Sequence, residues 1–236
     1  MIRRKFRIDL MLTFYFIALL LWVFGFESFK GTLASLLGSG IGLVSRTSLP
    51  VLTWQHIQLV ALASSAAILV SLLLGMIVHL TRNEEAESLV MKLGSILETI
   101  PSAAVIALSI PLFGYGNGPV LMALWVYAIL PILRNTIVGL QSINPSIQDA
   151  ATGIGMSPLQ RLLKIEMPLA RPMILAGIKT ALVINISLAT IGATVGAGGL
   201  GVPIIAGIRS YDPLLVLQGS IAVILMALLT ERALRS

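Results

Sequence analysis

Few side chains in this sequence could take part in chemistry. The chain of 236 residues has no cysteine and two histidines, His56 and His79, which excludes disulfides and cysteine-ligated metals and argues against a histidine-rich metal site. No nucleophile has a base placed beside it, as an enzyme would need. No Gly-x-x-x-x-Gly-Lys-Ser/Thr loop is present to hold the phosphates of ATP. We therefore expect no catalytic residue, metal or cofactor in this chain.

Glu98 is the one acidic residue inside an apolar stretch long enough to cross a membrane. Carboxylates at such depth are costly, and ion-coupled carriers keep them for function. Here the favoured interpretation is structural, with Glu98 satisfied by Lys92 or by a backbone group that Pro101 frees. His56 and His79 fall at the two ends of another apolar stretch, where we expect them at the membrane interface.

Hydroxyl-bearing residues recur at helical spacing in two apolar stretches. Thr180, Ser187, Thr190 and Thr194 form one stripe with Asn185 beside it, and Ser64, Ser71 and Gly75 form another. Small residues in such stripes most often let membrane helices approach closely. The alternative is the polar wall of a translocation path, and both can hold together because a path lies where helices meet. The candidate path residues are Ser64, Ser71, Glu98, Thr180, Asn185, Ser187, Thr190 and Thr194.

The stretch that ends with Thr194 is followed by four glycines in six residues, Gly196, Gly198, Gly199 and Gly201. They disfavour a stable helix and permit close backbone approach. The apolar run 202–208 that follows is too short to span a membrane. A flexible linker would not carry this apolar run, so we favour a re-entrant or interfacial segment that acts as an external gate.

The elements that must position these residues are membrane helices. The chain is 57% hydrophobic and 11% charged, against about 25% charged in ordinary soluble domains. Stretches of about twenty apolar residues are needed to span the hydrocarbon. Six candidates are present, the third of them kinked or broken near Pro101 and the fourth containing Pro131, at 10–26, 58–80, 93–112, 120–140, 173–195 and 214–230. The glycine-rich run 31–45 is left outside, lying on the membrane.

The basic residues indicate an orientation. Of the 16 Lys and Arg, all but Lys30, Arg46 and Arg209 fall on one side of a six-span arrangement. The positive-inside rule places that side, with both termini, in the cytoplasm. The net charge of +6 is therefore interpreted as topological rather than as a sign of nucleic-acid binding.

A polar island at 149–172 lies between the fourth and fifth spans, on the cytoplasmic side. Asn144-Pro145 and Ser157-Pro158 are both helix-start signals. Gly153 and Gly155 end the first short helix and allow a sharp turn, and Pro168 is expected to end the second at about Glu166. The result is a helix, a glycine elbow and a second helix that can dock on a partner, with Leu159, Leu162 and Leu163 entering a groove.

This island resembles the loop that identifies binding-protein-dependent ABC transporter permeases. That loop reads Glu-Ala-Ala, three residues, Gly, nine residues, Ile, one residue, Leu-Pro. The island has Asp149 for Glu and Met167 for Leu, two departures that keep charge or apolar character. The resemblance implies an ATPase-coupling role for Asp149, Ala150, Ala151, Gly155, Ser157, Leu159, Leu162, Leu163, Ile165 and Pro168.

From about residue 55 to 230 the order of features resembles the permease subunits of ABC importers for osmoprotectants such as glycine betaine, choline and carnitine. The resembling segments are 98–102, 110–114, 130–136, the island and 196–201. The resemblance implies an all-α integral membrane protein with a type I importer core. It also implies a second permease subunit, ATPase subunits that hold ATP and Mg²⁺, and a soluble or anchored substrate-binding protein.

The expected organisation is an N-terminal anchor helix and external segment (1–54), a permease domain (55–231) and a cytoplasmic tail (232–236), in the cell inner membrane. Methionine and other type I importers share the loop and the glycine-rich gate, so the solute stays open. The alternatives from other classes are an ion-coupled secondary carrier, which Glu98 would serve, and a membrane enzyme or scaffold.

Overall fold

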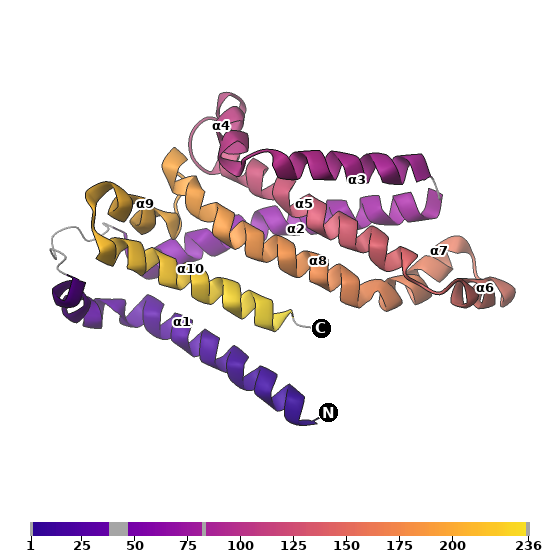
Figure 1. Ribbon diagram of the computed structural model, residues 1–236, viewed down its shortest axis with the longest axis horizontal. Coiled ribbons are helices and arrows are strands. Elements are labelled where there is room, and N and C mark those ends of the chain that lie inside the picture. The colour runs from indigo at the N-terminus through magenta and orange to yellow at the C-terminus, as the bar shows by residue number, and fades with distance from the viewer. Residues whose placement is uncertain (1, 38–46, 82–83, 235–236) are drawn as a thin grey trace.

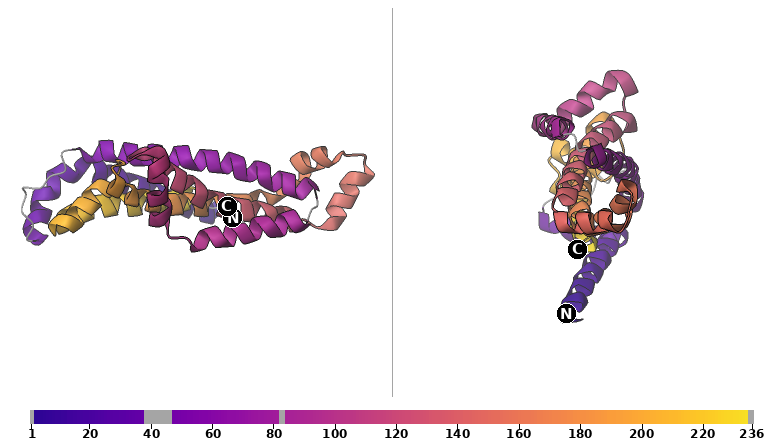
Figure 2. Two further views of the ribbon diagram at one scale, coloured as in Figure 1. Left: turned by 90° about the horizontal axis from the view of Figure 1, so that it is seen from above. Right: turned by 90° about the vertical axis from the view of Figure 1, so that its right-hand side faces the viewer.

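The computed structural model describes residues 2–37, 47–81 and 84–234, and of these the side chains of all but 2–9, 84, 86, 97 and 98. Every regular element in these residues is a helix, which confirms the predicted all-α class. The helices form a long, narrow bundle (Figures 1 and 2).

The long helices are α1 (Ile2–Leu37), α2 (Leu49–Thr81), α5 (Asn117–Gln141), α8 (Met167–Leu188) and α10 (Pro213–Ala233). The short ones are α3 (Glu84–Thr99), α4 (Ser102–Phe113), α6 (Pro145–Gly153), α7 (Pro158–Arg161) and α9 (Gly201–Ser210). A π-helical turn, η1 (Leu162–Glu166), precedes α8, and a 3₁₀ turn, η2 (Ala189–Val195), follows it. In the described residues, five helical runs are long and apolar enough to cross a membrane: Leu10–Leu37, Leu49–Thr81, Asn117–Gln141, Pro158–Val195 and Pro213–Ala233.

The third of the six expected spans, at 93–112, is broken at Pro101 rather than kinked. Pro101 is extended, with φ −60° and ψ 133°, and separates α3 from α4. With 12 residues, α4 is about 18 Å long, too short to cross alone. It turns away from the direction of α3 (Figures 1 and 2). The phenolic hydroxyl of Tyr127 in α5 donates to the carbonyl of Ile100 at the break, which satisfies backbone that non-helical geometry exposes.

The expectation that 31–45 lies outside the helices is wrong for its first seven residues, because α1 continues to Leu37. Residues 38–45 fall outside the described part of the chain. Ala34 is buried in the same core cluster as Val23 and Phe26. This packing outweighs the weak helix propensity of Gly31.

The expected helix end near Glu166 is also wrong. Residues Pro158–Val195 form one continuous helical run, because the π-helical turn η1 leads directly into α8. In that turn the Met167 N–H donates to the Leu162 carbonyl, five residues back. Pro168 then occupies the first turn of α8, where a missing N–H is tolerated.

Helices α2, α5 and α8 pack closely along their lengths through small residues. A Cβ atom added to Gly177 of α8 would lie 2.6 Å from the carbonyl oxygen of Pro131 in α5. One added to Gly75 of α2 would lie 2.7 Å from Cγ2 of Thr136 in α5. Ala67, Ala128 and Ala181, one from each helix, are fully buried in a shared cluster. The core of the bundle is therefore built on close backbone approach.

The two ends of the bundle carry different elements. Helices α6 and α7 lie at one end, and α9 lies at the other (Figure 1). The first residues of α1 and the last of α10 both point toward the α6–α7 end (Figure 1). Trp22 of α1 donates from Nε1 to the Gln218 carbonyl of α10, with 3.0 Å between N and O. The terminal helices thus pair along the side of the bundle.

Replacing Gly177 with leucine tests the close approach of α5 and α8. The new side chain would meet the α5 backbone, and overpacking of this kind costs about 1–3 kcal/mol. We expect a lower thermal denaturation midpoint for the purified protein in detergent. Gly31→Leu is the control, because a Cβ there meets nothing within 4 Å. Equal midpoints for the two variants would contradict this packing.

Candidate functional site

The polar island forms two short helices whose starts are capped as the sequence predicts. Asn144 accepts a hydrogen bond from the Ser146 N–H, with Pro145 at the first helical position of α6. Ser157 and Gln160 form a reciprocal capping box at the start of α7. Each cap satisfies N–H groups that a helix start leaves without partners. The two helices therefore begin at fixed residues.

Gly155 makes the turn between these helices. Its φ is +84°, in the region that residues with a side chain rarely adopt. Its N–H donates to the Thr152 carbonyl at 2.9 Å, and the Met156 N–H donates to the Ala151 carbonyl at 3.1 Å. A Cβ at Gly155 would meet nothing within 4 Å. The backbone conformation, rather than crowding, is therefore what requires glycine here.

The island presents apolar side chains at its surface. Leu159 and Leu163 are 56% and 53% exposed, as a docking role would require. Ile154, at the elbow, is 75% exposed. It was not predicted from the sequence, although an apolar residue between Gly153 and Gly155 is a signal that could have identified it. The other exposed residues among those predicted from the sequence are Asp149, Ala150, Gly155, Ser157 and Pro168.

Two selected residues, Leu162 and Ala151, are buried instead. Leu162 is fully buried beside Leu140, Ile143 and Ala170, so it cannot enter a partner's groove, and Ala151 is 3% exposed. A third selected residue, Ile165, is half-buried. Neighbouring residues of a helix point about 100° apart around its axis, so Leu162 can face the bundle while Leu163 faces outward. Leu162 therefore holds the island to the bundle.

A buried carboxylate, which the sequence analysis did not select, connects the island to α2. The Glu166 side chain is 1% exposed. Its Oε1 accepts from Nε of Arg161 at 2.8 Å, and its Oε2 lies 2.8 Å from Nε2 of His79, near the end of α2. Nη1 of Arg161 also donates to Oγ1 of Thr152 in α6 at 3.0 Å. His79 is thus partnered inside the chain rather than placed freely at an interface.

Three of the candidate path residues are buried between helices of this chain. Nδ2 of Asn185 in α8 donates to Oγ of Ser64 in α2 at 2.9 Å. Ser71 of α2 donates to the Ile129 carbonyl of α5 at 3.0 Å. Their relative exposure is 2% or less. These contacts join helices, which is the packing interpretation of the α2 stripe.

The other hydroxyl stripe, on α8 and η2, faces outward. Thr180, Ser187 and Thr194 are exposed and Thr190 is half-buried. Their hydroxyls donate to carbonyls three or four residues earlier in the same helical run. The stripe therefore lies on a face that the rest of this chain leaves uncovered. The Glu98 side chain lies outside the described part of the structure.

The glycine-rich segment 196–201 packs on the other end of α2. Gly196 and Gly199 have φ of +82° and +90°. The Gly199 N–H donates to Oε1 of Gln55 at 3.1 Å, and a Cβ on Gly199 would lie 3.2 Å from Nδ1 of His56. His56 itself is fully buried, with Nε2 2.9 Å from the Ile186 carbonyl of α8.

Close approach explains two more glycines of the segment. A Cβ on Gly198 would lie 2.2 Å from Oε1 of Gln55, and one on Gly201 would lie 2.0 Å from the Thr190 carbonyl oxygen. A hollow of about 1140 Å³ adjoins the segment, and its polar lining includes Gln55, Gln58 and Asn117. The segment is thus held against α2 and η2, and α9 begins directly after it.

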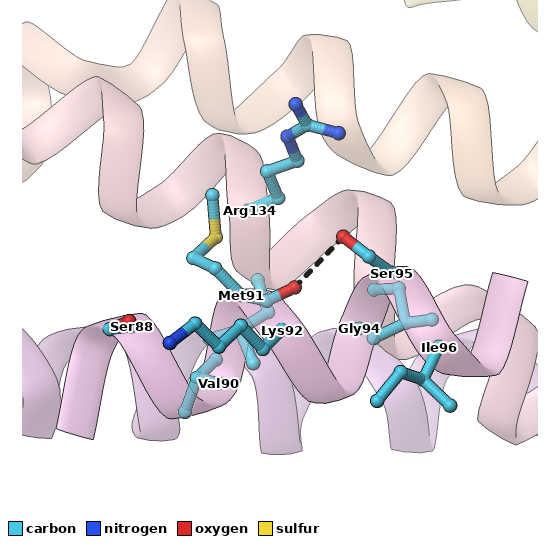
Figure 3. A pocket seen from close by; sticks show the side chains of 10 residues that line it. Ser88, Val90, Met91, Lys92, Gly94, Ser95, Ile96 and Arg134 are labelled. Atoms are coloured by element: carbon cyan, nitrogen blue, oxygen red, sulfur yellow. Dashed lines mark hydrogen bonds between the residues drawn. The ribbon is translucent and has the colours of Figure 1, made fainter. Parts of the chain in front are cut away.

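A second hollow, of about 600 Å³, lies between α3 and α5. Figure 3 shows Lys92 and Ser95 on α3 and Arg134 on α5. The Ser95 hydroxyl donates a hydrogen bond to the Met91 carbonyl at 3.1 Å. The Arg134 side chain extends away from α3 (Figure 3). Across the described residues, no group of three or more His, Asp or Glu side chains could hold a metal ion.

Comparisons with known proteins agree with this arrangement. Residues 71–235 match the family model for the binding-protein-dependent transport system inner membrane component. The osmoprotectant import permease protein OsmW of Salmonella typhimurium is 40% identical over 185 residues, covering 76% of this chain and 85% of OsmW. The choline transport system permease protein OpuBB of Bacillus subtilis is 36% identical over 182 residues, covering 77% and 83%. OsmY of Salmonella typhimurium, also an osmoprotectant import permease protein, is 34% identical over 218 residues, covering 92% and 87%.

The fold has a counterpart among solved structures. A chain of the MetNI methionine ABC transporter in an inward-facing conformation superposes with a TM-score of 0.69 at 21% identity, covering 77% of this chain and 90% of that one. At this identity the likeness concerns the fold. With the family match over most of its length, the chain is a multi-pass inner membrane permease and belongs to the family of binding-protein-dependent transport system inner membrane components.

Proposed function

We propose that this permease is the translocating subunit of an ATP-driven importer for quaternary ammonium osmoprotectants, the class that includes glycine betaine, choline and carnitine. The observation that carries the ATP-driven part is the island: two capped helices, a positive-φ glycine elbow and exposed apolar residues at one end of the bundle. Such a rigid, partly apolar surface suits docking on an ATPase subunit.

The solute class is supported by the relatives. OsmW and OsmY are osmoprotectant import permeases and OpuBB is a choline transport permease. Uptake of labelled glycine betaine, choline, carnitine and methionine, in cells of the source organism with and without this chain, tests the assignment. Loss of methionine uptake alone would favour an amino-acid importer instead, and uptake driven by an ion gradient without ATP would favour a secondary carrier.

The proposed partners follow from the same surfaces. ATPase subunits, which hold ATP and Mg²⁺, would receive the island, and a soluble or anchored substrate-binding protein would deliver the solute at the α9 end. A second permease subunit, identical or paralogous, would face the outward stripe Thr180, Ser187, Thr190 and Thr194. Segment 196–201 would be the external gate. The domain limits proposed from the sequence, 1–54, 55–231 and 232–236, fall inside helices α2 and α10, so they divide functions rather than folded units.

The proposed orientation, with the island and both termini in the cytoplasm, can be tested with single cysteines. The native chain has none, and Ser157 and Ser210 are both exposed at opposite ends of the bundle. We expect Ser210→Cys in intact cells to react with an impermeant thiol reagent and Ser157→Cys to react only after the membrane is opened. The reverse pattern would invert the orientation, and reaction of both in intact cells would also contradict it.

The gate assignment predicts that Gly199→Val slows uptake. The substitution combines an unfavourable φ with contact against His56, and overpacking of about 1–3 kcal/mol, added to the barrier for gate movement, corresponds to a loss of about fivefold to 150-fold in rate. Gly196→Val is the matched control, because it has a similar φ but no atom within 4 Å of its Cβ. Normal initial uptake by Gly199→Val, with equal protein in the membrane, would count against a gate.

The docking assignment predicts that Gly155→Val and Ala150→Glu insert normally yet lose the ATPase and solute uptake together. Gly155→Val changes the angle between α6 and α7, and Ala150→Glu places charge on the exposed surface. Ala150 is a better position for this test than Ala151, because Ala150 is exposed whereas a glutamate at the buried Ala151 would also disturb the packing of the chain itself. The measurements are ATPase copurification in detergent, and ATP hydrolysis and uptake in reconstituted vesicles.

Gly153→Val controls for side-chain bulk in the same loop. Its backbone lacks a positive φ, and a Cβ there meets nothing within 4 Å. We expect it to keep most of its ATPase. Retention of ATPase and uptake by both Gly155→Val and Ala150→Glu would remove the docking assignment.

A further inference from the structure

The Glu166 carboxylate is the point at which the island, α8 and α2 meet. It is buried, and each oxygen contacts a different element: Arg161 of α7 at 2.8 Å and His79 of α2 at 2.8 Å. A buried carboxylate is costly unless its oxygens are paired, so this one favours the arrangement in which Arg161 and His79 both contact it, and Arg161 alone still compensates its charge if His79 is lost. The position of α2 relative to the island is therefore fixed more firmly here than apolar packing alone would fix it.

Arg161 extends the same contact to α6. Its Nη1 donates to Oγ1 of Thr152 while its Nε holds Glu166. Both helices of the island are thus tied to one carboxylate. A displacement of the island moves this carboxylate, and the His79 contact transmits the displacement to α2.

The far end of α2 holds the glycine-rich segment. Gln55 accepts from the Gly199 N–H, and His56 contacts the Ile186 carbonyl of α8. Gln55 and His79 lie on one uninterrupted helix of 33 residues, roughly 36 Å apart at 1.5 Å per residue. α2 therefore has polar contacts to the island at one end and to segment 196–201 at the other.

A displacement of the island reaches α8 and α2 by different routes. α8 continues directly from α7 through η1, so a displacement of the island reaches α8 through the chain itself. α2 has no such continuity with the island, and its other polar contacts, Ser71 with the Ile129 carbonyl, Ser64 with Asn185 and His56 with the Ile186 carbonyl, all lie nearer the α9 end. The hydrogen bond to Glu166 is the polar contact that ties α2 directly to the island.

We propose that His79 and Glu166 are positioning residues that make α2 move with the island, so that the ATP-driven displacement of α6 and α7 reaches the gate segment 196–201 through α2. This inference rests on the proposed function. It assigns these residues no contact with the solute or with ATP. Their effect is on how much solute moves for each ATP hydrolysed.

His79→Leu tests the contact between α2 and Glu166 without changing a residue of the island. We expect the ATPase to copurify and hydrolyse ATP, while solute moved per ATP falls about threefold to tenfold, within the range that coupling mutations span. His79→Gln keeps an N–H donor for Glu166, and we expect it to restore most of the loss. A merely structural role would lower copurification and uptake together. Unchanged solute per ATP in His79→Leu would overturn the proposal.

A double-mutant cycle with Gln55→Leu tests transmission along α2. If the two ends act in series, the double variant loses no more solute per ATP than the more affected single variant. Sites this far apart that act independently give effects that multiply, and that result would overturn the proposal even if each single variant is impaired. Failure of the proposed function is distinguishable, because the unaltered chain would then neither retain an ATPase nor stimulate ATP hydrolysis.

Discussion

The close approach of α2, α5 and α8 is the constraint on which the rest of the structure depends. In hydrocarbon there is little hydrophobic force between helices, so association rests on van der Waals packing and hydrogen bonds between them. Gly177 and Gly75 let the backbones approach until a single added carbon would meet its neighbour at 2.6 or 2.7 Å. At that separation the few polar side chains of the interior can reach across.

Those polar side chains connect α2 with the helical run of η1 and α8 through three contacts. Glu166 of η1 and His79 meet at the island end, and the neighbouring residues Asn185 and Ile186 of α8 contact Ser64 and His56 toward the α9 end. Polar groups in a membrane interior are costly unless paired, so their spacing along both helices specifies one register. The same contacts place the island and the glycine-rich segment at opposite ends of a common pair of helices.

Local signals predicted the parts of the fold that depend on few residues. The caps at Asn144 and Ser157, the elbow at Gly155 and the break at Pro101 each follow from one side chain and its neighbours. Pro168 shows the limit of this reasoning, because a π-helical turn upstream satisfies the backbone and lets the helix continue. Gly31 shows another, because the packing of Ala34 outweighs local propensity.

The candidate site was predictable where a pattern was local and missed where it was assembled in three dimensions. The spacing from Asp149 to Pro168 located the island. Glu166 lay in that same motif, but His79, its partner, is 87 residues away, and no periodicity relates them. Likewise a stripe of hydroxyls does not say which side is covered: Ser64 and Ser71 face other helices of the chain, and Thr180 and Ser187 face away from it.

This division of hydroxyls bears on how a permease of the proposed function would treat its solute. The outward stripe on α8 and η2 offers hydroxyls that already donate to their own helical run, so its residues present chiefly lone pairs and, at the threonines, methyl groups. Such a wall attracts a cationic solute weakly, and a path must bind its solute weakly enough for release. With the proposed partners, strong discrimination among solutes would then belong with the substrate-binding protein, and the permease would contribute a passage whose opening depends on the proposed contact between α2 and the island.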